Sequence, residues 1–397
     1  MTHEAREEQR NRDTRGVKKR GPGHKLKLCF FFHRFDDGGA EKTTICLANE
    51  LAKKGHDVTI LVRYDYGPLR ERVSEDVTIL DMHLPENGKL KKNIRNVRYL
   101  RKLMNEGTYD VFAAVLTEMA QVSAIAYFLS NKKIPLVCIL HSTVSQENYS
   151  FKSIRYRLLR FFDRQYQAVV AVSKAVEQDY LRMTKSSKNH TVTIYNPVVN
   201  EELVRLSGED PDHPWLRKDR TFRTLILAGR LTPEKNHRLM FDALALAREK
   251  EDIRLILLGD GPLKEELTSE CEKRGLSDVV DFHGYVRNPY CYMRACDAVV
   301  MSSFYEGLPT VLIEALACGC RIISVDCPSG PDEILVHGTY GILVEPENPQ
   351  ALCDGILTGL SAESDEEKLT ARAQDFTVEG AVEAYETFFY HNMRSTS

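Results

Sequence analysis

The sequence AVVMSSFYEGLPTVLIEALA, residues 298–317, contains the unit from which the fold of this chain can be inferred. Ala298–Met301 is a short apolar run that indicates a buried strand, and a polar loop with one glycine follows it. Leu308–Ala317 then has the composition of an apolar helix, with Pro309 in its first turn, where a missing N–H costs little. A strand, a loop and a helix therefore follow one another within one short stretch.

This unit recurs along the whole chain. Apolar runs that indicate strands occupy 28–32, 58–62, 77–80, 111–116, 137–140 and 169–172 in the first half, and 224–228, 253–258, 279–282, 298–301, 321–325 and 341–344 in the second. Amphipathic helical patterns, such as 40–54 and 93–105, lie between these runs. Continuously apolar strands separated by helices indicate parallel sheets covered on both faces. We therefore predict an α/β protein with two doubly wound, Rossmann-like domains.

The boundaries of these domains follow from changes in composition. At 397 residues the chain exceeds what one hydrophobic core usually supports. A polar stretch begins at Asn196-Pro197, and strand–helix alternation resumes near 224. We predict an N-terminal domain at 25–197, a linker at 198–222, a C-terminal domain at 223–374 and a final helix at 375–397, which must dock on one of the two domains. Residues 1–24 are basic and almost without large apolar side chains, which predicts a disordered tail.

Composition excludes several classes of protein. The net charge of −3 gives no signal for nucleic-acid binding, and no run of about 18 apolar residues is available to span a membrane. Ten cysteines are present, but there is no CxxC motif and no histidine set at zinc spacing, so we predict no metal site. Without an export signal, reduced thiols in the cytoplasm are expected.

Two groups of charged residues indicate chemistry. Arg230 and Lys235 lie in a loop between a strand and a helix, where two cations and the helix N-terminus form a site for an anion such as a phosphate. Glu306 lies in the loop after 298–301, and Glu314 lies in the apolar helix that follows. An ionised carboxylate can accept two sugar hydroxyls, and burying one without a partner is costly. The alternatives are a solvated loop for the cations, a helix-end charge for Glu306 and a solvated face for Glu314.

At this point the sequence resembles a known family. The pair Glu306/Glu314, in the setting EGLPTVLIEALACG, is similar to the E-x7-E motif of the retaining glycosyltransferases of family 4. The sequence GGAE at 38–41 resembles the family's N-terminal GGxE loop, and Gly229-Arg230 with Lys235 resembles its GR-x4-K element, 71 positions before Glu306. GDGP at 259–262 and FHGYV at 282–286 occur at the expected intervals. The resemblance covers both halves and implies the GT-B fold, in which two such domains face a central cleft and a C-terminal helix can cross back to the N-terminal domain.

The resemblance also implies roles for individual residues. Arg230 and Lys235 should hold the nucleotide diphosphate and stabilise charge on the leaving group without a metal or another cofactor. Glu314 should bind the ribose, and Glu306 the transferred sugar near its reacting carbon. His141, which ends the strand 137–140, is expected to contact the donor sugar, so the predicted catalytic set is Glu306, His141, Arg230 and Lys235. Further donor contacts are expected from Gly39, from Tyr285 and Val286 at the base, and from Gly307, Leu308, Pro309 and Thr310.

The resemblance implies transfer of a hexose or N-acetylhexosamine from a UDP-sugar to a polyprenyl-diphosphate-linked or other glycan, in surface polysaccharide or glycoprotein glycan assembly. Two basic amphipathic helices at 89–102 and 151–164 predict attachment to an anionic membrane surface, on the cytoplasmic face of the cell membrane. The alternative is that their Lys and Arg residues simply face water. A GT-B epimerase or phosphorylase, or a non-catalytic nucleotide-binding protein, are the competing functions. The first two have no clear motif here, and the intact charged residues disfavour the third.

Overall fold

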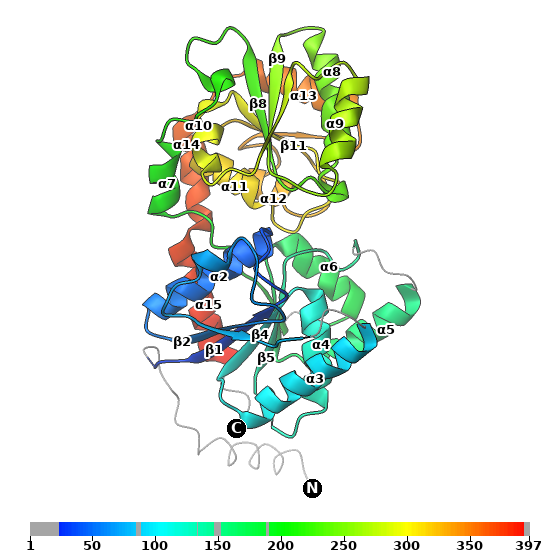
Figure 1. Ribbon diagram of the computed structural model, residues 1–397, viewed down its shortest axis with the longest axis vertical. Coiled ribbons are helices and arrows are strands. Elements are labelled where there is room, and N and C mark those ends of the chain that lie inside the picture. Colours follow the sequence, from blue (N-terminus) through cyan, green and yellow to red (C-terminus); the bar gives the residue numbers. More distant parts are fainter. Residues whose placement is uncertain (1–23, 85–88, 133, 147–151, 188–189, 393–397) are drawn as a thin grey trace, which may run out of the picture.

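The computed structural model describes residues 24–84, 89–132, 134–146, 152–187 and 190–392, and the side chains of α3 and α5 from Ile94 and Arg157 onward. The predicted tail at 1–24 lies outside these residues, apart from His24. Two α/β domains are stacked along the long axis of the molecule (Figure 1). Because both sheets are parallel and covered by helices, the two-domain α/β prediction is confirmed.

The N-terminal domain is built on a seven-stranded sheet with the order β3-β2-β1-β4-β5-β6-β7, in which every pairing is parallel. Its strands are β1 (Lys27–Phe32), β2 (Asp57–Val62), β3 (Thr78–Asp81), β4 (Val111–Val115), β5 (Leu136–Leu140), β6 (Ala168–Ala171) and β7 (Thr191–Thr193). Its helices are α2 (Gly39–Lys53), α3 (Lys89–Glu106), α4 (Thr117–Phe128), α5 (Lys152–Asp163) and α6 (Lys174–Thr184).

Each face of this sheet has its own core. Phe30 and Phe32 of β1 pack with α2 on one face, whereas Cys29 and Phe31 pack with α3 and α4 on the other. Alternate residues of one strand point to opposite faces, so a strand buried on both sides must be apolar throughout. This requirement explains why β1 has the continuous apolar run from which it was predicted.

The C-terminal domain repeats the arrangement with a six-stranded parallel sheet of order β10-β9-β8-β11-β12-β13. Its strands are β8 (Arg223–Ala228), β9 (Ile253–Leu258), β10 (Val280–Gly284), β11 (Ala298–Met301), β12 (Ile322–Val325) and β13 (Ile342–Val344). Its helices are α8 (His237–Arg248), α9 (Lys264–Lys273), α10 (Pro289–Ala295), α11 (Thr310–Ala317), α12 (Pro331–Leu335), α13 (Pro349–Ser361) and α14 (Glu366–Ala373). Helix α11 begins at Thr310 rather than at the predicted Leu308, because Pro309 adopts an extended conformation directly before it.

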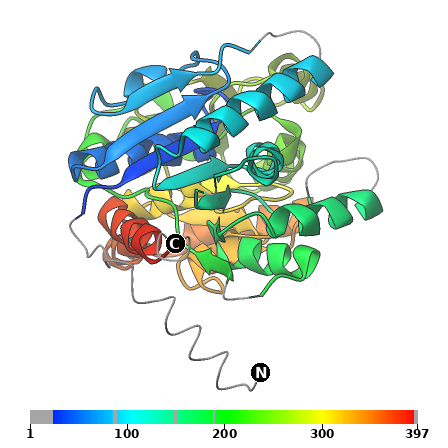
Figure 2. The same ribbon diagram turned by 90° about the horizontal axis from the view of Figure 1, so that it is seen from below.

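The two domains are connected by more than one segment. The stretch 198–222, predicted as a linker, contains α7 (Glu201–Ser207) and a short 3-10 turn, Pro214–Leu216. The final helix α15 (Val378–Asn392) leaves the C-terminal domain and packs beside α2 on the N-terminal sheet (Figure 2). Tyr385 and Phe389 of α15 are buried in the core that contains β1. The chain thus crosses between the domains twice, and the apolar face of the final helix is buried against the N-terminal domain.

Candidate active site

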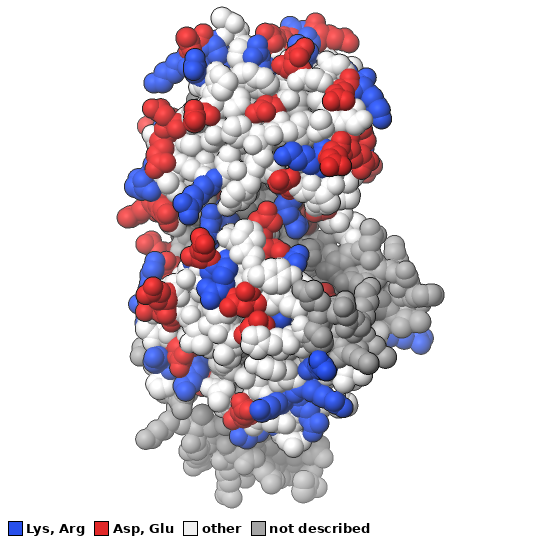
Figure 3. Space-filling model, in the orientation of Figure 1, with Lys and Arg blue, Asp and Glu red and all other residues white. Residues whose placement is uncertain are grey.

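A cleft of about 640 Å³ separates the two domains and is lined by residues from both. Ligands of doubly wound sheets bind beyond the carboxyl ends of the strands, and this cleft lies where those ends of the two sheets meet. Basic and acidic side chains both gather at the junction of the domains (Figure 3). All the predicted site residues line the cleft: Gly39, His141, Arg230, Lys235, Tyr285, Val286, Glu306, Gly307, Leu308, Pro309, Thr310 and Glu314.

The loop after β8 carries both predicted phosphate-binding cations. Arg230 is half-exposed, and its guanidinium lies 3.6 Å from the Glu234 carboxylate. Lys235 ends a 3-10 turn, Asn236 takes a left-handed conformation, and α8 begins at the next residue. The hydroxyl of Ser302 donates to the carbonyl of Lys235 at 3.0 Å, which fixes this loop to the neighbouring strand end. The loop therefore presents two cations beside the start of a twelve-residue helix, as an anion site requires.

Glu306 lies at the carboxyl end of β11 and has two partners. Its carboxylate is 2.7 Å from the ammonium of Lys235 and accepts a hydrogen bond of 2.7 Å from the Ser303 hydroxyl. Ser329 donates to the carbonyl of Glu306 at 2.7 Å, so the backbone is held as well. The residues predicted to bind the diphosphate and the transferred sugar are thus adjacent, because two neighbouring strands, β8 and β11, end side by side.

Glu314 is buried in α11, as its apolar surroundings predict, with 6% of its surface exposed. Its partner comes from the other domain: the ammonium of Lys42, in the first turn of α2, lies 2.5 Å from the carboxylate. Lys42 also donates to the hydroxyl of Tyr290 at 3.1 Å. Burial lowers the pKa of Lys42, but the charge of Glu314 and the contact with Tyr290 raise it above its usual range, so the ammonium stays charged. Sequence reasoning missed Lys42, although it directly follows the GGAE motif.

His141 reaches the cleft from the end of β5. Burial lowers the pKa of its imidazole to about 4, so the ring is neutral at pH 7 and offers hydrogen bonds rather than charge to the cleft. Its backbone carbonyl lies against Gly307 of the C-terminal domain, where an added Cβ atom would be 1.9 Å from the carbonyl oxygen. Ser173 donates to the carbonyl of Gly307 at 2.8 Å. The two domains therefore touch at the level of the peptide backbone beside His141.

Glu41 and Gly259 also line the cleft. Glu41 of the GGAE motif is buried, and its carboxylate fills the space beside Gly38 that a side chain would need. Desolvation raises the pKa of Glu41 to about 7. Gly259 of the GDGP sequence has a φ of +137°, and a Cβ atom there would lie 2.1 Å from the carbonyl oxygen of Gly229. The glycine is required because the GDGP loop packs directly against the backbone next to Arg230.

The predicted base-binding residues lie at the edge of the cleft, after β10. Tyr285 is exposed, and its hydroxyl is 3.5 Å from the guanidinium of Arg72 on the opposite domain. Val286 follows it in the same loop and lines the cleft. An exposed aromatic ring and an apolar side chain at a cleft edge are suited to stacking against a flat base.

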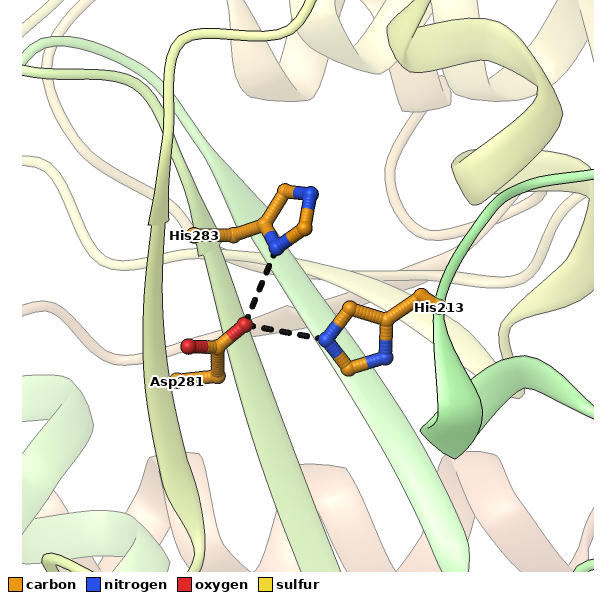
Figure 4. A group of neighbouring side chains, drawn as sticks. All are labelled: His213, Asp281 and His283. Carbon is orange, nitrogen blue, oxygen red and sulfur yellow. Dashed lines mark hydrogen bonds and ion pairs between the residues drawn. The ribbon is translucent and has the colours of Figure 1, made fainter.

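Outside the cleft, His213, Asp281 and His283 form a compact group (Figure 4). The Asp281 carboxylate is 2.9 Å from Nε2 of His213 and 3.1 Å from Nδ1 of His283. Nδ1 of His213 accepts the N–H of Trp215 at 3.0 Å, so the neutral ring carries its proton on Nε2 and donates it to Asp281. A metal-bound histidine normally donates the N–H of its other ring nitrogen to a neighbouring acceptor. Nδ1 of His213 instead accepts the N–H of Trp215, so it cannot act as such a donor. The group is therefore best described as a hydrogen-bonded connection between the segment before Trp215 and β10.

Comparison with known proteins agrees with this geometry. A family model described as Glycosyltransferase Family 4 matches residues 37–202, and one described as Glycosyl transferases group 1 matches residues 209–376. This chain belongs to the family 4 glycosyltransferases. Each model covers one of the two domains, and the fold class, GT-B, and the enzyme class, glycosyltransferase, follow from the match.

Relatives of this glycosyltransferase include two enzymes of Campylobacter jejuni. One, named N-acetylgalactosamine-N,N'-diacetylbacillosaminyl-diphospho-undecaprenol 4-alpha-N-acetylgalactosaminyltransferase, is 27% identical over 345 residues, which cover 84% of this chain and 90% of the relative. The other is named GalNAc-alpha-(1->4)-GalNAc-alpha-(1->3)-diNAcBac-PP-undecaprenol alpha-1,4-N-acetyl-D-galactosaminyltransferase. It is 26% identical over 368 residues, which cover 89% of this chain and 95% of the relative. The crystal structure of Anabaena HepE in complex with UDP and glucose superposes with a TM-score of 0.74, at 23% identity, over 91% of this chain and 99% of that one.

Proposed function

We propose that this glycosyltransferase transfers a hexose or an N-acetylhexosamine from a UDP-sugar to a polyprenyl-diphosphate-linked glycan, with retention of anomeric configuration. The observation that carries the proposal is the grouping of two cations and two carboxylates in one cleft: Arg230 and Lys235 lie beside the start of α8, Glu306 lies in the loop after the neighbouring strand β11, and Glu314 lies in α11. Both Campylobacter relatives are named for transfer to undecaprenol-linked glycans, and HepE was crystallised with UDP. These names support the choice of donor and acceptor class.

Each group then has a defined task. Arg230 and Lys235 hold the diphosphate, and their charge stabilises the negative charge that develops on the leaving UDP as the glycosidic bond breaks. Glu314 accepts the ribose hydroxyls, and Glu306 accepts hydroxyls of the transferred sugar while it orients Lys235 from 2.7 Å. The neutral ring of His141 reaches the sugar from the N-terminal domain. Tyr285 and Val286 contact the base, and Gly39 and the segment 307–310 approach the donor through their backbone.

The acceptor is proposed to reach the N-terminal domain from a membrane surface. On α4 and α5 the rings of Phe128 and Phe161 lie 5.4 Å apart, and both side chains are exposed. Leu158 is also exposed, at 48%, next to the exposed Arg157 and Arg160. Exposed aromatic and aliphatic side chains bordered by arginines are typical of a helix that lies in an anionic membrane interface. In the described residues no helix is long and apolar enough to cross a bilayer.

These exposed side chains support a peripheral position of the enzyme on the cytoplasmic face of the cell membrane, held by the basic stretches predicted at 89–102 and 151–164. Flotation with liposomes that contain anionic lipid tests this part of the proposal. The double variant F128S/F161S should float less than the wild type, and high salt should release both proteins. Failure of the wild type to float at low salt would exclude the membrane role without affecting the proposed chemistry.

The chemistry itself is tested by turnover of a panel of nucleotide sugars. Release of UDP is measured with UDP-hexoses, UDP-N-acetylhexosamines and their GDP counterparts, with and without a polyprenyl-diphosphate-linked glycan. The proposal expects a UDP-sugar to be consumed faster when the lipid-linked acceptor is present. Consumption of GDP-sugars alone, or of no nucleotide sugar at all, would contradict the proposed donor.

A further inference from the structure

The interdomain contact of Lys42 occupies the part of the cleft that the proposed function assigns to the nucleoside. Lys42 comes from α2 of the N-terminal domain, whereas Glu314 and Tyr290 come from α11 and α10 of the C-terminal domain. All three residues line the cleft. A ribose that places its hydroxyls on the Glu314 carboxylate therefore meets the Lys42 ammonium, which lies 2.5 Å from one oxygen of that carboxylate.

The two members of this ion pair differ in their freedom to move. The side chain of Glu314 is 8% exposed and belongs to the apolar helix α11, so its carboxylate has little room to move. The side chain of Lys42 is 34% exposed. Its ammonium is a point charge on a flexible stem of four methylene groups, which can turn to a new partner at small cost. When a ligand enters, Lys42 is the member that moves.

A destination for the ammonium is present nearby. Gly38 and Gly39 begin α2 at the cleft, and the N-cap residue Gly38 has no side chain that could cap the helix. Gly38 and Gly39 line the same cleft as Arg230 and Lys235, so the start of α2 borders the proposed diphosphate site. The first turn of a fifteen-residue helix favours an anion, and an adjacent ammonium strengthens that preference.

We propose that Lys42 is a donor-binding residue that exchanges partners: it neutralises Glu314 in the free enzyme, and when the donor binds, the ribose hydroxyls take its place while its ammonium moves to the diphosphate. The inference rests on the proposed function, because it assumes that Glu314 receives the ribose. It adds a phosphate contact from the N-terminal domain to those of Arg230 and Lys235. Lys42 thereby links donor binding to the relative arrangement of the two domains.

The exchange has a measurable consequence, because it treats ligands with and without phosphate differently. Uridine has to displace the ammonium but offers it no new partner, whereas UDP offers the diphosphate. Lys42→Met keeps most of the side-chain volume and removes the charge. Loss of one charge-assisted phosphate contact should weaken UDP binding by about 10-fold or more. Uridine should bind to this variant as tightly as to the wild type or more tightly, since nothing then competes for Glu314.

Binding of uridine, UMP and UDP is measured for the wild type, Lys42→Met, Lys42→Arg and Arg230→Ala, by titration calorimetry for UDP and by ligand-observed NMR for the weaker ligands. We expect the preference for UDP over uridine to fall by about 10-fold or more in Lys42→Met and to be largely restored in Lys42→Arg, which retains the charge. Equal loss of affinity for both ligands, with thermal unfolding unchanged, would overturn the exchange and leave Lys42 as a structural partner of Glu314. If the wild type binds neither ligand, the proposed function fails instead.

Discussion

Replacement of Gly307 by alanine tests the arrangement of the two domains around the cleft. The added Cβ atom would lie 1.9 Å from the carbonyl oxygen of His141, 2.7 Å from its carbon and 3.2 Å from the backbone nitrogen of Ser142. All three atoms belong to the backbone of the opposite domain, so no side chain can turn away to make room. The buried bond from the Ser173 hydroxyl to the Gly307 carbonyl, 2.8 Å long, holds the loop in this position.

The size of the effect follows from these distances. Carbon and oxygen atoms reach favourable contact near 3.5 Å, so the loop and the end of β5 would have to separate by roughly 1.5 Å. The separation would move Glu306, where we propose that the transferred sugar binds, away from His141 on the other side of this contact. A misplacement of about 1 Å can reduce catalysis about 100-fold. We expect kcat/KM for sugar transfer to fall by about 100-fold in Gly307→Ala, with little change in thermal stability because the interior of each domain is untouched.

The assay is UDP release with saturating acceptor, alongside thermal unfolding followed by circular dichroism. Gly208→Ala is the matched control, because a Cβ atom at Gly208 would lie 3.4 Å from its nearest neighbour, the carbonyl oxygen of Arg205. The control should retain wild-type activity. Activity of Gly307→Ala above half that of the wild type would refute the close domain contact and the reasoning built on it.

Three further outcomes are expected. Glu306→Gln should reduce sugar transfer by about 100-fold in an initial-rate assay, since it removes the charge that faces Lys235; unchanged transfer would reject its role. Burial raises the pKa of Glu41 to about 7, above its value in the unfolded chain, so its contribution to stability is complete below about pH 4.5 and is lost as the pH rises through 7. The melting temperature of Glu41→Gln should therefore rise relative to that of the wild type as the pH increases from 5 to 8. A difference in melting temperature that stays constant with pH would contradict this. Glu118→Ala removes the carboxylate that lies 2.6 Å from the buried guanidinium of Arg63; because the Glu118 side chain is 60% exposed, the free energy of unfolding should fall by only about 1–2 kcal/mol in urea titration, and a loss below about 0.5 kcal/mol would show that the pair is dispensable.

Much of the fold could be predicted because the strands of doubly wound sheets appear in the sequence as continuous apolar runs. Strands such as β1, β9 and β11 are buried on both faces, so all their residues except Lys27 and Arg254 are apolar, and the apolar run itself identifies the strand. The start of α11 was placed two residues early, because proline is accepted both in a first helical turn and directly before it. Local composition does not separate these two conformations.

The positions of the proposed site residues could be predicted where these residues follow strand ends, and less so where they depend on how the domains face each other. The sequence places Arg230, Lys235 and Glu306 on two strand ends, and the structure shows those strands to be neighbours. The partner of Glu314 could not be found in this way, because Lys42 lies 272 positions away and the contact exists only when the domains meet. A cation one residue after the GGAE motif, opposite an unpaired buried carboxylate, is the signal that would have identified it.

The proposed function requires above all that Arg230 and its neighbours form a binding site for a nucleoside diphosphate. Calorimetric titration of UDP into the wild type and into Arg230→Ala measures this in one experiment. We predict that the wild type binds UDP and that Arg230→Ala binds it at least about 10-fold more weakly, since one charge-assisted contact to phosphate is lost. Equal affinity of the two proteins for UDP, or no binding by the wild type, would contradict the central claim.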